Sequence, residues 1–105
     1  CDDGSVYTGC NVENASFGAT ICAERSAACQ AVSCGNRAFM KLAVVSSGKD
    51  YCFPCGICRQ FLQELAPDLT VLCARPDGDY QSRRLSKLLP EGFFSSALAV
   101  KGKTD

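Results

Sequence analysis

Three cysteines near the predicted starts of two helices constrain the fold of this chain more than any other feature. Cys55 and Cys58 form the motif PCGIC, whose spacing allows two thiolates to face one metal ion. Cys22 lies in TICAERSAACQ, the predicted start of a helix made almost wholly of small residues. The three thiolates meet at one point if the two helices lie side by side with their N-termini level.

Predicted strands and helices alternate along the chain, which indicates an α/β domain with helices packed on a sheet. The expected strands cover residues 5–10, 40–47 and 68–74. One helix is expected over about residues 22–32, and a second begins after Pro54 and ends before Pro67. The apolar stripe of the second helix consists of Ile57, Phe61, Leu62 and Leu65. We also expect a turn at Asp77-Gly78 and a short helix within residues 83–90.

The composition of the chain narrows the classes of function. Its 105 residues are expected to form one domain, with a tail over residues 95–105. Eleven basic residues balance eleven acidic ones, so neither a nucleic acid nor a membrane surface is an expected partner. No membrane-span or signal-peptide pattern is evident, and a soluble, cytoplasmic protein is expected.

The nine cysteines allow two interpretations. Cysteine this dense in a short chain can signal a disulfide framework, but the count is odd. Cys29, Cys34 and Cys73 lie in apolar runs, where a free cysteine behaves as a small hydrophobic residue.

The start of the sequence resembles half of a hairpin. Asp3-Gly4 is a hairpin-turn dipeptide directly before the first predicted strand, and the partner strand is missing. We therefore expect a fragment that begins inside a hairpin and leaves the strand from Ser5 with an unfilled neighbouring position.

The three cysteines are consistent with two kinds of zinc site. Three protein ligands leave a fourth position for water, as in catalytic sites. The chain has no histidine, but Cys52 is close enough in sequence to supply a fourth thiolate and close a structural site.

Glu24 and Arg25 favour the catalytic alternative. A carboxylate two residues beyond a ligand could exchange protons with a zinc-bound water. Three thiolates on a divalent ion leave one net negative charge, which an arginine donating to sulfur would offset. Taken alone, Glu-Arg in a first helical turn is commonly no more than helix-end electrostatics, and an isolated CxxC could be a redox dithiol. The combination of C-x-E with P-C-x-x-C is far more specific, being the signature of zinc nucleobase deaminases.

The segments GCNVENASFGATICAERSA and PCGICRQFL resemble the small homotetrameric cytidine deaminases over about residues 4–94. The resemblance implies a three-layer α/β/α fold with a central mixed sheet, lacking the family's N-terminal helix and first strand. It implies hydrolysis of cytidine or 2′-deoxycytidine to the uridine and ammonia, with Zn²⁺ held by Cys22, Cys55 and Cys58. Glu24 would be the proton shuttle.

The same resemblance implies how a pyrimidine nucleoside is bound. Asn11 and Glu13 would hold the sugar hydroxyls, and backbone groups near Ala23 and around Phe53-Pro54 would hold the edge of the base. Phe93 would reach the pyrimidine of a neighbouring subunit in a homotetramer. Two alternatives stay open: a zinc-binding structural or assembly module without turnover, and an aminonucleoside-antibiotic deaminase, against which the intact NVENAS segment argues.

Overall fold

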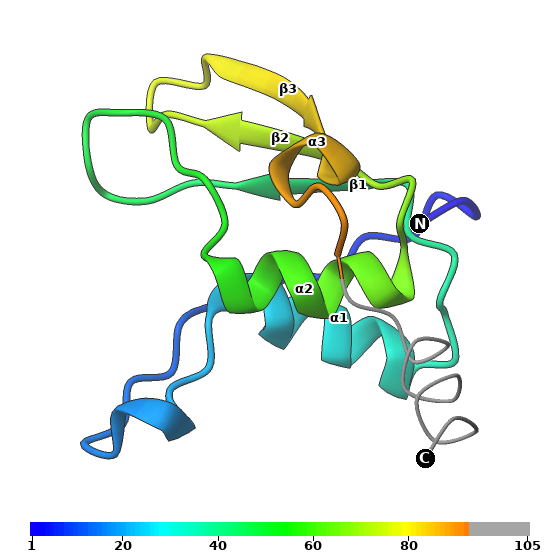
Figure 1. Ribbon diagram of the computed structural model, residues 1–105, viewed down its shortest axis with the longest axis horizontal. Helices are drawn as coiled ribbons and strands as arrows, with labels where there is room; N and C mark the ends of the chain where they lie inside the picture. Colours follow the sequence, from blue (N-terminus) through cyan, green and yellow to red (C-terminus); the bar gives the residue numbers. More distant parts are fainter. Residues whose placement is uncertain (93–105) are drawn as a thin grey trace.

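Three strands form one mixed sheet in the computed structural model, which describes residues 1–92 (Figure 1). The strands are β1 (Lys41–Val44), β2 (Thr70–Ala74) and β3 (Tyr80–Arg84), in the order β1-β2-β3. β1 and β2 are parallel, with Leu42 opposite Val71, and β2 and β3 are antiparallel. The parallel pair is joined through a helix, as parallel strands require. The predicted α/β class with a mixed sheet is confirmed.

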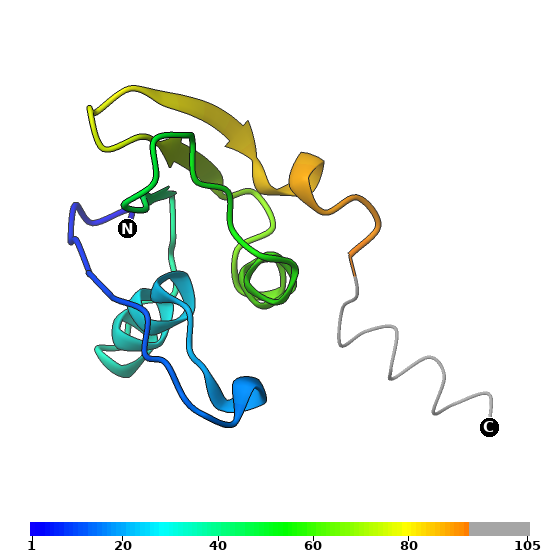
Figure 2. The same cartoon turned by 90° about the vertical axis from the view of Figure 1, so that its left-hand side faces the viewer.

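The two longer helices, α1 (Ala23–Ser33) and α2 (Gly56–Leu65), lie side by side on one face of the sheet (Figure 2). Both begin at the same end of the molecule, on the left in Figure 1. The 3-10 helix η1 (Phe17–Ala19) precedes α1, and α3 (Leu85–Leu88) directly follows β3. Residues 1–92 thus contain the sheet and one helical layer of the expected three-layer arrangement. No helix in this range is long and apolar enough to cross a membrane.

The core lies between α2 and the sheet. Its buried members are Ala28, Val44, Leu62, Ala66, Leu69, Val71, Cys73 and Leu85. Cys73 is a fully buried thiol in β2, which agrees with its expected role as a small hydrophobic residue. Cys29 and Cys34, for which the same was expected, are exposed.

The inward face of α2 differs from the predicted stripe at Ile57 and at Leu65, the second of which is half-buried and lies outside the core cluster. Leu62 is buried and Phe61 packs against the core, but Ile57 is 66% exposed. Cys58 takes the inward position in the first turn, since it lies four residues before Leu62 on the same side of the helix.

The predicted strand over residues 5–10 is wrong. In the part of the chain before α1, the structure contains one isolated bridge, Val12 with Ile21, and no strand. Gly4 does form the expected turn, with φ +84° and its N–H donated to the carbonyl oxygen of Cys1. A cavity of about 650 Å³ separates residues 4–9 from β1, so the two segments cannot form a ladder of hydrogen bonds.

The segment of residues 5–10 instead makes a close approach to α1 at Gly9. A Cβ atom at Gly9 would lie 2.5 Å from the backbone nitrogen of Ala27 and 2.6 Å from the carbonyl oxygen of Ala23. Only a glycine fits there, and the small residues of α1 make this contact possible.

Gly9→Ala should therefore lower the free energy of unfolding by about 1–3 kcal/mol, since the backbone of residues 8–10 must move away from α1. Urea unfolding of the zinc-loaded protein measures the change. Gly18→Ala is the matched control, because a Cβ there meets nothing within 4 Å. Equal stability of the two variants would contradict the close packing of Gly9.

Candidate metal centre and active site

Three sulfur atoms converge where α1 and α2 begin. The Sγ atoms of Cys22 and Cys55 are 3.7 Å apart, and those of Cys55 and Cys58 are 3.4 Å apart. All three sulfurs lie within 4.8 Å of one another. Tetrahedral zinc with Zn–S bonds of about 2.3 Å places two sulfurs roughly 3.8 Å apart. The cluster therefore fits one zinc ion.

The local backbone explains why the sulfurs meet. Cys22 and Cys55 are the N-caps of α1 and α2, each with extended backbone angles that turn the chain into its helix. Cys58 follows in the first turn of α2 and is fully buried. Two helix N-termini thus face the same point, and their partial positive charges favour thiolates there.

Cys52 does not join the cluster. It packs against the hydrophobic core, and its backbone N–H donates to the carbonyl oxygen of Ala74 at 3.1 Å. Among residues 1–92, the only group of three or more potential metal ligands contains Cys22, Cys55 and Cys58. A zinc ion with these ligands keeps a fourth position for water, which favours the catalytic alternative.

Burial and neighbouring donors affect the thiols differently. Burial raises the pKa of Cys58, with the nearby sulfurs and the charge of Glu24 acting in the same direction. Burial also acts to raise the pKa of Cys55. Backbone N–H groups at the start of α2 and the thiols of Cys58 and Cys22 outweigh it and leave that pKa below its usual value. Metal binding at Cys58 is therefore coupled to the release of its proton.

Arg25 lies where a positive charge offsets the thiolates. One of its terminal nitrogens is 3.7 Å from the Sγ of Cys22 and donates to the carbonyl oxygen of Thr20 at 3.0 Å. Contacts with the sulfurs of Cys22 and Cys58 raise the pKa of the guanidinium, despite the opposing effect of burial. Arg25 therefore lies within reach of the sulfur whose charge it is predicted to offset.

Glu24 is buried, with 9% of its surface exposed, although it is an acidic residue. It lies in the first turn of α1, where the helix dipole favours a negative charge. It lies two residues after Cys22, and its charge contributes to the raised pKa of Cys58. Glu24 also lines the 650 Å³ cavity, but none of the three cysteines does, so that cavity is not evidence for a nucleoside pocket.

The residues expected to bind substrate are only partly brought together. The side-chain oxygen of Asn11 accepts the backbone N–H of Ala23 at 2.7 Å, which places Asn11 at the start of α1. Its amide nitrogen remains available to a ligand. Glu13 is exposed on the segment around η1 that projects away from the sheet (Figure 1). Phe93 lies outside the described residues.

Arg59 has a role that sequence reasoning missed. Its Nε donates to the carbonyl oxygen of Pro54 at 2.8 Å, and a terminal nitrogen donates to that of Leu88 at 2.8 Å. Arg59 therefore ties the residue before Cys55 to α3. Arg59 directly follows Cys58, but its partner Leu88 is 29 residues further along the chain, so no local pattern could predict the pair.

An α/β fold that gathers three thiol ligands at two helix starts, with a buried carboxylate in the same turn, defines the class of zinc enzymes that activate water. Comparison with known proteins identifies the family within that class. Residues 1–74 match the model of the cytidine and deoxycytidylate deaminase zinc-binding region. The chain belongs to this family, and zinc is its cofactor.

Relatives and solved structures agree with this assignment. The chain is 48% identical over 92 residues to the cytidine deaminase of Halalkalibacterium halodurans, covering 87% of this chain and 70% of that protein. The crystal structure of cytidine deaminase from Burkholderia pseudomallei has a TM-score of 0.83 and 43% identity, covering 88% of this chain and 75% of the other. That from Mycobacterium tuberculosis has a TM-score of 0.74 and 43% identity, with 88% and 72% covered.

Arg25→Gln should weaken zinc binding by about tenfold, because removing a partner of a metal ligand commonly costs this much and the cluster then carries an uncompensated negative charge. Competition with a chromogenic chelator measures the affinity. Arg37→Gln, at an exposed arginine, is the control. Wild-type zinc affinity in the Arg25 variant would show that its contact with Cys22 does not stabilise the site.

Proposed function

We propose that this protein hydrolyses cytidine and 2′-deoxycytidine to uridine and 2′-deoxyuridine, releasing ammonia. The observation that carries the proposal is a buried carboxylate, Glu24, in the helical turn that follows Cys22, together with three sulfurs spaced for one zinc ion. A structural zinc site needs no such carboxylate. Membership of the cytidine and deoxycytidylate deaminase family supports the substrate class.

Zinc held by Cys22, Cys55 and Cys58 supplies a Lewis acid that lowers the pKa of water from ~15.7 towards ~7. Glu24 then has the task of moving protons. Its carboxylate takes one from the attacking water and delivers it to the pyrimidine ring nitrogen, while the water oxygen bonds to C4. Glu24 then takes the proton of the hydroxyl now on C4 and passes it to the amine, so the C–N bond breaks, ammonia leaves and the C–O bond becomes the carbonyl of the uridine.

The hydrogen bonds of the site restrict how the base can be held. The N–H of Ala23 is donated to Asn11, and the carbonyl oxygen of Pro54 accepts from Arg59. The carbonyl oxygen of Ala23 points along α1 towards Gly9, so we propose the carbonyl group of Phe53 for the edge of the base. The amide nitrogen of Asn11 is the donor proposed for a sugar hydroxyl, and Glu13 is the proposed acceptor, approaching as the segment around η1 folds over the nucleoside.

The proposed assembly is a homotetramer. Large apolar side chains lie exposed in the single chain, and a neighbouring subunit would cover them: Val6 at 85%, Phe17 at 88% and Ile57 at 66%. Phe93 is proposed to contact the pyrimidine bound in such a neighbour. The proposed compartment is the cytoplasm, where reducing conditions preserve thiol ligands, and all nine cysteines are free.

Glu24→Gln tests the role of the carboxylate. The amide preserves size and hydrogen bonding but cannot shuttle a proton, so kcat for uridine formation should fall by about 10²–10⁴-fold. The zinc content should stay at the wild-type value, since Glu24 is not a ligand. A zinc-loaded variant that deaminates cytidine at the wild-type rate would contradict the mechanism.

A further inference from the structure

The segment that delivers Cys55 to the metal site has no regular secondary structure. Residues 45–54 connect the end of β1 to the start of α2, and the first part of this loop, residues 45–50, is exposed. Such a loop would leave the position of Cys55 variable unless later residues hold it. Two backbone contacts do so in part: the N–H of Cys52 donates to Ala74, and buried Pro54 accepts from Arg59.

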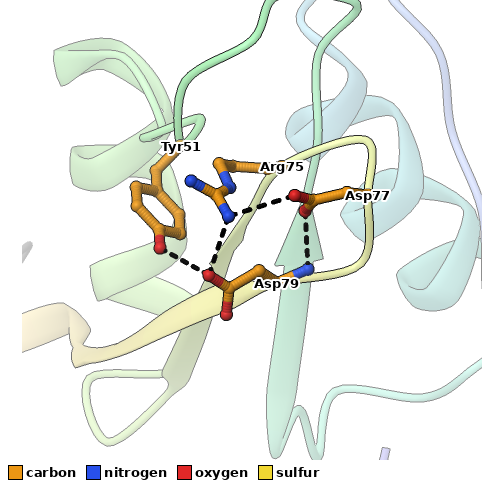
Figure 3. A network of polar contacts seen from close by, with 4 residues as sticks. All are labelled: Tyr51, Arg75, Asp77 and Asp79. Atoms are coloured by element: carbon orange, nitrogen blue, oxygen red, sulfur yellow. Dashed lines mark hydrogen bonds and ion pairs between the residues drawn. The ribbon is translucent and has the colours of Figure 1, made fainter.

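A third contact lies on the other side of the loop, where Tyr51 meets the hairpin between β2 and β3 (Figure 3). We call Tyr51, Arg75, Asp77 and Asp79 the hairpin clamp. The hydroxyl of Tyr51 donates to Oδ2 of Asp79 at 2.7 Å. A terminal nitrogen of Arg75 lies 3.0 Å from the same Asp79 oxygen and 3.0 Å from Asp77. The guanidinium also lies 4.8 Å from the centre of the Tyr51 ring.

The hairpin clamp has more hydrogen bonds than an isolated pair of surface charges. One carboxylate oxygen of Asp79 accepts from both Tyr51 and Arg75, so the hydroxyl and the guanidinium constrain each other. Backbone groups add two further hydrogen bonds. The N–H of Arg75 donates to the carbonyl oxygen of Asp79, and the N–H of Asp79 donates to Oδ1 of Asp77. The Nε of Arg75 is buried without a hydrogen-bond partner, a cost that the surrounding contacts must offset.

The clamp acts on the metal site through a short segment. Tyr51 and Cys52 are adjacent, and both are attached to the β2–β3 hairpin, the first through its side chain and the second through its N–H. Three residues separate Tyr51 from Cys55, and Pro54 among them removes much of the backbone freedom. A change in the position of Tyr51 should therefore also change the position of Cys55.

We propose that Tyr51, Arg75 and Asp79 are positioning residues for Cys55, and that they keep its thiolate within zinc-binding distance of Cys22 and Cys58. The inference rests on the proposed zinc site but not on the reaction. Outer partners that orient metal ligands commonly affect metal affinity by 10–100-fold, and the clamp acts in this way from the neighbouring hairpin.

Tyr51→Phe is the principal test, because it removes one hydroxyl and retains the ring beneath Arg75. Zinc affinity, measured by chelator competition without substrate, should fall by about tenfold. Asp79→Asn retains an acceptor for the hydroxyl but loses the charge, and should weaken zinc binding less. The double variant should be no worse than Tyr51→Phe by more than about twofold, since the two residues act on Cys55 through the same contact between Tyr51 and Asp79.

Tyr80→Phe is the matched control: it removes a hydroxyl from the same hairpin, at an exposed residue outside the clamp. Its zinc affinity should equal that of the wild type. Far-UV circular dichroism of the zinc-free proteins separates positioning from unfolding. Wild-type zinc affinity in both clamp variants, or an equal loss in Tyr80→Phe, would overturn the proposal. The test measures zinc binding and not deamination. Its result can therefore be interpreted even if the protein does not deaminate cytidine.

Discussion

The side-by-side placement of two helix starts is the constraint on which the rest of the structure depends. Cys22 and Cys55 cap α1 and α2, and Cys58 follows in the next turn, so the three sulfurs can meet only while the helices stay in register. Close packing requires small residues in α1, such as Ala28, and a glycine where residues 5–10 cross it. The geometry of the metal site therefore depends on the packing of the two helices.

Charge compensation is the second requirement of the metal site. Three thiolates and the buried carboxylate of Glu24 gather in a small volume, which is unfavourable without compensation. Arg25, two helix N-termini and a divalent ion supply the opposite charge. Around them, Arg59 and Tyr51 attach the segment before Cys55 to α3 and to the β2–β3 hairpin. The site thus extends beyond its ligands to elements that are far apart in sequence.

The sequence was sufficient to predict the features that depend on local pattern. The Cys55–Cys58 pair, the position of Glu24 after Cys22 and the limits of α2 follow from spacing, helix-start signals and Pro67, all within a few residues. The meeting of Cys22 with Cys55, 33 residues further along, depends on the packing of the two helices. The strand over residues 5–10 failed because β propensity describes what a segment can fit, whereas pairing requires a neighbour at hydrogen-bonding distance. The contact of Arg59 with Leu88 likewise depends on how distant elements dock, and no short pattern encodes it.

The most direct test of the account is the zinc coordination shell, measured by X-ray absorption on the zinc-loaded protein. An open catalytic site predicts three sulfur neighbours at about 2.3 Å and one oxygen at about 2.0 Å. Addition of a cytidine analogue that resembles the hydrated pyrimidine should alter the oxygen shell and leave the sulfur shell unchanged. Four sulfur neighbours, with no response to the analogue, would show a closed structural site and contradict the deaminase mechanism.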